Sequence, residues 1–137
     1  MKTKILVTGS RHYADLETVK KHLLDIGPDI LVHGRALGAD ACAHFAAEDI
    51  GGIEIRSYPA GMMSRSERNA LMVTTEHTKQ EPISLCLAFL VNDNSEDAWD
   101  CIARCIAAGI DCELGDDSDG GVVKAFNALV KKGKKKR

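Results

Sequence analysis

Two short segments combine glycine with side chains that can bind an anion. The first is TGSR (8–11), where glycine lets the backbone approach a ligand, serine offers a hydroxyl and arginine offers a planar fork of N–H donors. The second is HGRALGAD (33–40), which carries two glycines and an arginine. Each follows an apolar run and precedes a helical pattern, and a helix N-terminus attracts anions. Together the two segments predict phosphate binding.

Several other chemistries lack their sequence signatures. Neither segment is a G-x-G-x-x-G or a Walker A sequence, which disfavours a dinucleotide dehydrogenase or a P-loop NTPase. No serine–histidine–aspartate or cysteine–histidine nucleophile set stands out. The cysteines are odd in number and form no Cys-x-x-Cys pair, so we interpret them as small core residues and expect neither a metal site nor a cofactor. They are Cys42, Cys86, Cys101, Cys105 and Cys112.

The elements that position these segments alternate along the chain. Strand-like apolar runs occur at 5–7, 30–32, 53–58 and 84–91, the third nearer a sheet edge. Helical spacing follows each run, from Leu16 to Gly27, from Asp40 to Gly51, and over 64–77 and 95–108. Parallel neighbours need crossover connections, so this alternation predicts an α/β fold with a mainly parallel sheet. Residues 9–11, 33–40 and 92–95 should then lie along one rim.

Charge is distributed unevenly. Residues 131–137 hold six of the 18 basic residues and no acidic one, so the other 12 basic and 20 acidic residues give residues 1–130 a charge of −8. An acidic body lacks the basic face that nucleic-acid binding requires, which disfavours nucleic acid as a partner. The expected organisation is one domain over 1–114, an acidic linker over 115–121, a terminal helix over 122–130 and a basic tail over 131–137. No run is long and apolar enough to span a bilayer, and no secretory signal is present, which favours a cytoplasmic location.

The ordered motifs resemble a known family. ILVTGSR, HG-x-x-x-GAD, a proline after the third strand, RN-x-x-M (68–72) and AAGI (107–110) occur in the order typical of the SLOG superfamily. The chain is most similar to its short bacterial and phage proteins of the YspA type, related to the YpsA group, over about residues 4–114. The resemblance implies a Rossmann-like, three-layer α/β fold that binds a nucleotide or nucleotide derivative.

The rim and the resemblance together give the expected ligand contacts. They are Gly9, Ser10, Arg11, His33, Gly34, Arg35, Gly38, Asp40, Arg68, Asn69, Asn94 and Ser95. Related phosphoribohydrolases of the "lonely guy" type use an arginine and a glutamate, and the resemblance assigns these roles to Arg68 and to Glu96 or Asp97 if the chain is an enzyme. Plain alternatives remain: Glu96 and Asp97 suit the first turn of a helix, and His33 suits a bond to nearby backbone.

The sequence departs from the family at two loops. Relatives commonly carry a glycine-rich PGG-x-GT loop after the fourth strand, where this chain has LVNDNS (90–95). In the second segment relatives usually have HGGARGAD, whereas here Arg35 replaces a glycine and Leu37 stands at the position of an arginine.

Three functions therefore remain open. The first is a sensor or binding protein for an ADP-ribose-like molecule or a nucleoside phosphate. The second is a nucleotide hydrolase that cleaves an N-glycosidic or phosphate linkage. The third is a protein-interaction module with vestigial ligand loops.

The segment 95–108 raises the question of assembly. One apolar stripe includes Trp99 and Ile102, and an adjacent one includes Cys101 and Cys105. One sheet face covers only one stripe, so the pattern predicts a homodimer or higher homo-oligomer through this helix. The alternative is that the terminal helix folds back over the second stripe.

Overall fold

The computed structural model describes the backbone of residues 2–135 and the side chains of residues 2–133. Its strands are β1 (Lys4–Gly9), β2 (Ile30–His33), β3 (Glu54–Ser57), β4 (Leu85–Phe89) and β5 (Cys112–Leu114). Its helices are α1 (Leu16–Ile26), α2 (Ala39–Ile50), α3 (Arg65–Glu76), α4 (Glu96–Ala107) and α5 (Gly120–Lys135). None of these helices combines the length and the hydropathy needed to cross a membrane.

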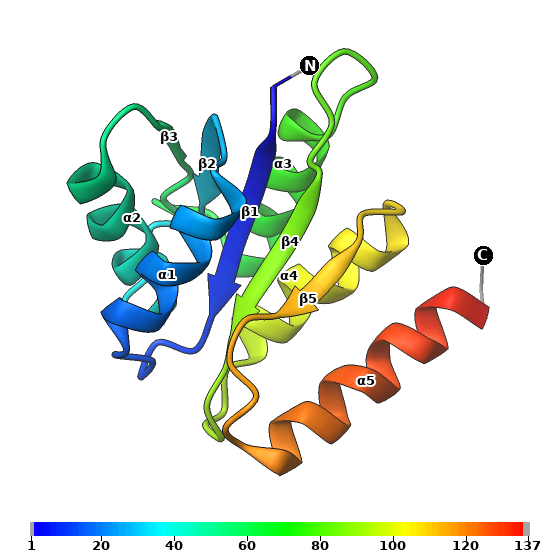
Figure 1. Cartoon of the computed structure of the whole chain (residues 1–137). Helices are drawn as coiled ribbons and strands as arrows, with labels where there is room; N and C mark the ends of the chain where they lie inside the picture. Colours follow the sequence, from blue (N-terminus) through cyan, green and yellow to red (C-terminus); the bar gives the residue numbers. More distant parts are fainter. Residues whose placement is uncertain (1, 136–137) are drawn as a thin grey trace.

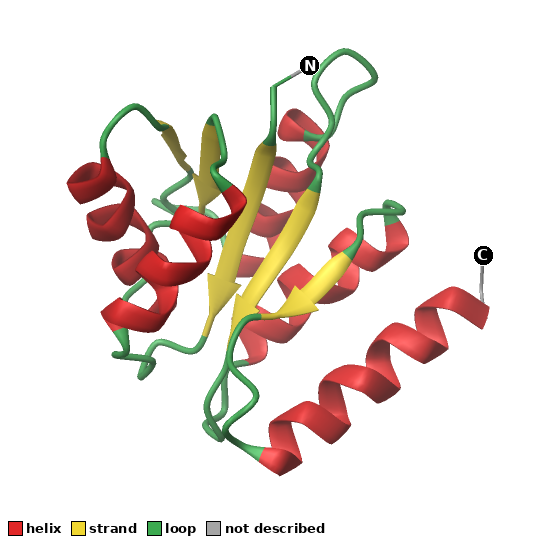
Figure 2. Cartoon of the chain, in the orientation of Figure 1, coloured by secondary structure: helices red, strands yellow, loops and turns green. Residues whose placement is uncertain are grey.

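The five strands form one sheet in the order β3-β2-β1-β4-β5, and every neighbouring pair is parallel. Val7 in the central strand lies opposite His33 of β2 and Leu87 of β4. The sheet is the middle layer between helices (Figure 2). This is the expected Rossmann-like α/β fold, and β3 occupies the expected sheet edge. The three-residue strand β5 was not predicted, because so short an edge strand leaves no periodic pattern.

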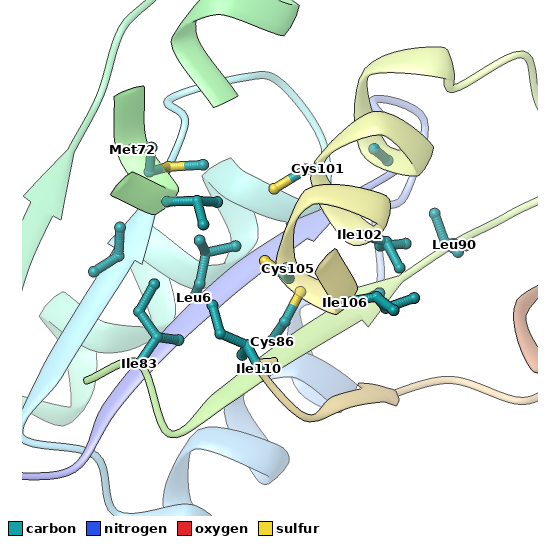
Figure 3. Close-up of a cluster of buried hydrophobic side chains, with 14 of the residues drawn as sticks. Leu6, Met72, Ile83, Cys86, Leu90, Cys101, Ile102, Cys105, Ile106 and Ile110 are labelled. Carbon is teal, nitrogen blue, oxygen red and sulfur yellow. The ribbon is translucent and has the colours of Figure 1, made fainter. Parts of the chain in front are cut away.

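Each face of the sheet has its own core. On one face α1 and α2 cover Ile5, Val7 and Leu31. On the other, α3 and α4 cover Leu6, Val32 and further residues of β1, β2 and β4. Figure 3 shows this second core, in which Cys101 and Cys105 of α4 lie near Leu6 and Cys86. Three of the five cysteines are fully buried and two are partly buried.

The terminal helix differs from the expectation in length. It begins at Gly120 and continues to Lys135, taking in most of the segment 131–137, whose last two residues lie outside the described part. Lysine has a high helix propensity, and cations are favourable near a helix C-terminus, so the basic segment extends the helix.

Helix α5 packs against α4 (Figure 1). Its Val122 and Phe126 are buried in the same core as Ile106, and a Cβ at Gly133 would lie 2.1 Å from Ile106 Cγ2. The second stripe of α4 is covered too, because Cys101 and Cys105 are fully buried within the chain. The sheet covers this second stripe, since Cys101 and Cys105 share a core with Leu6 and Cys86, whereas α5 lies over Ile106 of the first stripe. The alternative, in which the terminal helix covers the second stripe, is therefore wrong in its detail, and the homo-oligomer stays a prediction without an uncovered stripe to support it.

Candidate functional site

The topological switch point of the sheet lies between β1 and β4. The chain runs outward from β1 to β2 and β3, then returns to place β4 on the other side of β1. The loops after β1 and β4 therefore lead to helices on opposite faces of the sheet (Figure 1). Open α/β sheets bind ligands in the crevice that this divergence creates.

Backbone contacts bind the two loops together at this point. The N–H of Ser10 donates to Phe89 O at 3.0 Å, and the N–H of Val91 donates to Ser10 Oγ at 3.0 Å. A Cβ at Gly9 would lie only 2.0 Å from Phe89 O, so this approach requires glycine. Ser10 is fully buried and serves this junction.

A cavity of about 520 Å³ opens at the switch point, a volume in the range of small-molecule sites. Its lining comes from the end of β1, from the loops after β1, β2 and β4, from the first turn of α3 and from the first two turns of α4. The lining residues are Gly9, Arg11, Ala36, Arg65, Ser66, Asn94, Ser95, Glu96, Asp97, Ala98 and Asp100. Six of these were predicted from the sequence as ligand or catalytic residues.

Two arginines bring positive charge to the cavity. Arg11 follows β1 and Arg65 begins α3, and both are exposed. Within residues 2–133 neither side chain has a hydrogen-bond or ion-pair partner. The carboxylate of Glu96 also lacks one in this range, whereas Asp100 accepts hydrogen bonds from Asn69 and Arg104 at 3.0 Å each. The cavity therefore presents unpaired charges of both signs.

The N-terminus of α4 forms one wall. Ser95 occupies the N-cap position but makes no capping hydrogen bond, contrary to the usual role of serine there. Its hydroxyl donates to Asp93 instead, and the other oxygen of Asp93 lies 2.9 Å from Nδ1 of His12. No side chain caps this end of α4, whose first-turn residues line the cavity.

Arg68 is buried, and each of its three guanidinium nitrogens donates within the protein. Nε donates to Asn69 Oδ1 at 2.9 Å, and Nη1 donates to the backbone oxygens of Gly34 and Tyr58. Nη2 donates to both carboxylate oxygens of Asp97, at 3.0 and 2.8 Å. A Cβ at Gly34 would lie 2.4 Å from Nη1, so glycine admits the guanidinium. In this arrangement the guanidinium of Arg68 is directed at groups of the protein itself, and Arg68 does not line the cavity.

Asn69 continues the same network. Its amide nitrogen donates to the backbone oxygen of Asp97 at 3.1 Å and to Asp97 Oδ1 at 2.9 Å. Arg68 and Asn69 thus join α3 to the start of α4 behind the cavity wall and do not line the cavity. Asp97 lines it, with its carboxylate held from behind.

The loop after β2 is organised by Asp40. Its buried carboxylate accepts the backbone N–H groups of Gly34 and Ala36 at 3.0 and 3.2 Å. Burial raises the pKa of Asp40 to about 7 despite these hydrogen bonds. The loop contacts its neighbour, because the N–H of Ala39 donates to Ser10 O at 3.1 Å, and a Cβ at Gly38 would lie 2.1 Å from that oxygen.

Arg35 adopts a left-handed backbone conformation with φ of 57°, the conformation that suits glycine at this position. Its side chain is exposed and is not part of the cavity lining. The sequence predicted Arg35 as a positive contact for the ligand, but at the cavity Arg65 provides this positive charge.

His33 is buried at the end of β2. Its Nδ1 accepts the backbone N–H of Arg35 at 2.9 Å, and its Nε2 lies 3.0 Å from Nδ1 of His44. Burial, followed by the positive charges of His44, Arg35 and Arg68, lowers the pKa of His33 to about 4. Its contacts are those of the alternative that the sequence left open, a bond to nearby backbone.

Sequence reasoning missed Arg65, Ser66 and Asp100 among the polar lining residues. A signal existed for the first two: Ser64 and Glu67 form a capping box, which marks a helix start just after β3 and hence at the same rim. Asp100 gave no such signal, since it lies in the second turn of α4. No group of three His, Cys, Asp or Glu side chains in the described part of the chain is placed to hold a metal ion.

Comparisons of the chain with protein-family models, with curated proteins and with solved structures returned no match.

Proposed function

We propose that this chain binds a nucleotide-derived ligand, either an ADP-ribose-like molecule or a nucleoside phosphate, as a sensor or binding protein of SLOG-like type. The observation that carries the proposal is the cavity at the switch point, which combines unpaired Arg11 and Arg65 with an uncapped helix N-terminus. Phosphate is the common biological anion that such a combination suits.

The remaining lining suits the sugar of such a ligand. Glu96 offers an unpaired carboxylate and Asn94 an amide, and both can accept hydrogen bonds from ribose hydroxyls. The cavity thereby offers donors for phosphate and acceptors for a diol.

Binding is favoured over hydrolysis by the state of Arg68 and Asp97. A catalytic arginine needs N–H groups aimed at the charge that develops in the transition state. Arg68 directs its donors to Gly34, Tyr58, Asn69 and Asp97 instead. These contacts suit a structural role for Arg68 and Asp97 in the cavity wall better than a catalytic one.

The test is calorimetric titration of the full chain with AMP and with ADP-ribose. We expect Arg11→Ala and Arg65→Ala each to weaken binding by roughly tenfold to a hundredfold, the value of a charge-assisted hydrogen bond. Lys124→Ala is the matched control, because it removes one exposed positive charge from α5, outside the cavity. Absence of binding to either nucleotide, or unchanged affinity in both arginine variants, overturns the proposal.

A further inference from the structure

The contact between His12 and Asp93 crosses the switch point. His12 follows Arg11 in the loop after β1, and Asp93 precedes Asn94 in the loop after β4. Both of these neighbours line the cavity. Nδ1 of His12 lies 2.9 Å from Asp93 Oδ2, so the pair stands where the two loops meet beside the cavity.

Asp93 is firmly held on its other side. Its second carboxylate oxygen accepts the hydroxyl of Ser95, and only 15% of its side chain is exposed. Burial alone would raise the pKa of Asp93, but hydrogen bonds from Ser95, His12 and Ser10 outweigh burial and lower it. Asp93 is therefore a fixed carboxylate at neutral pH.

This carboxylate determines how the imidazole is presented. An oxygen facing Nδ1 favours the form that carries a proton on Nδ1. This contact places Nε2 on the side of the ring away from Asp93. The His12 side chain is 72% exposed, and Nε2 has no partner within residues 2–133. Asp93 therefore orients the ring through Nδ1, and Nε2 is free to contact a ligand.

We propose that His12, which is next to the lining residue Arg11 in the chain but is not itself part of the lining, is an additional contact for an anion bound beside Arg11. Asp93 positions its imidazole, and ligand binding is accompanied by uptake of a proton on that ring. The proposal rests on the proposed function. Among the described residues, Asp93 is the charged group in contact with His12, and Arg11 is its neighbour in the chain.

Electrostatics links the proton to the anion. Histidine is the side chain that ordinarily changes charge between pH 5 and 8. An anion bound beside Arg11 gives the imidazole a second negative neighbour in addition to Asp93, which favours the protonated ring. Because coupling between two binding events is reciprocal, the protonated ring also binds the anion more tightly.

The experiment counts protons. ADP-ribose is the probe, because its pyrophosphate does not titrate between pH 6 and 8. Titration at pH 7 in two buffers of different ionisation enthalpy should show net uptake of protons by the unmodified chain, of at most one per site. Affinity should rise as the pH falls from 8 to 6, by at most about tenfold per unit for one proton.

Substitutions assign the proton to its residue. His12→Gln should abolish the uptake, make affinity independent of pH and weaken binding at pH 6 by about three- to tenfold. Asp93→Asn should shift the pH dependence to lower pH. His22→Gln is the control, because His22 lies on α1 against Phe89 and should leave the uptake unchanged.

The outcomes separate the two proposals. ADP-ribose binding without proton uptake, or with the same uptake in His12→Gln, overturns the role of His12 and leaves nucleotide binding standing. Failure of the unmodified chain to bind ADP-ribose at any pH between 6 and 8 overturns both.

Discussion

The buried guanidinium of Arg68 offers the sharpest test of the site. Arg68→Met keeps an apolar stem of similar length and removes every donor. The substitution removes the donor to the backbone oxygens of Gly34 and Tyr58 and leaves the carboxylate of Asp97 with only the amide of Asn69. If Arg68 has the structural role that these contacts indicate, its loss should appear first in the free energy of unfolding.

The magnitude follows from the burial of the pair. Removing one partner of a buried ion pair typically costs about 3–5 kcal/mol. The side chain of Arg68 is 4% exposed, but that of Asp97 is 23% exposed, so water replaces part of what Asp97 loses. We therefore expect Arg68→Met to lower the free energy of unfolding by about 3 kcal/mol, the lower end of that range.

Urea unfolding at neutral pH measures this loss, with an unchanged dependence on urea as evidence that both states are retained. Arg65→Met is the matched control, since Arg65 is an exposed arginine of the same helix without a partner in the described residues. Its effect should stay within about 0.5 kcal/mol. An Arg68→Met protein within about 1 kcal/mol of the unmodified chain would refute the reasoning and return Arg68 to the candidates for ligand contact.

Two further predictions concern buried charges. Because the pKa of His33 is lowered to about 4 in the folded chain, its contribution to stability is present above pH 6.5 and is lost as the pH falls toward 4. The pKa of Asp40 is raised to about 7, so the contribution of Asp40 to stability increases as the pH falls and opposes that of His33. Comparing the unmodified protein with His33→Gln separates the two, because Asp40 is present in both. Between pH 7 and 4.5 the variant should lose about 2–3 kcal/mol less of its free energy of unfolding, measured in urea. At the other end of the sheet, Lys4 Nζ is buried 2.9 Å from Glu76 Oε1 and 2.8 Å from Glu81 Oε1. Lys4→Met should lower the free energy of unfolding by about 3 kcal/mol. Lys20→Met should lower it by less than about 1 kcal/mol, because its partner Asp49 is exposed. Equal losses in the two variants would contradict a stabilising role for the buried ion pairs of Lys4.

Much of the fold could be predicted because its signals are local. An apolar run such as Ile5 to Val7 is typical of a strand that is buried on both faces of a sheet. Helical segments between such runs predict crossover connections and therefore parallel strands. Gly9 and Arg11 were placed at the rim by the same logic, since a strand's end fixes where its loop emerges. Helix α5 was located but not delimited, because its lysines carry no apolar pattern.

The sequence by itself therefore determined the order of the elements, the parallel sheet and the rim that carries the cavity. Tertiary structure alone decided which polar residues of that rim face the cavity and which face the interior. Arg65 and Arg68 lie one turn apart on α3, yet one lines the cavity and the other is enclosed by Gly34, Tyr58 and Asp97. Periodicity predicts which residues share a face of a helix, but the groups that this face contacts depend on how α3 and α4 pack against each other on the sheet.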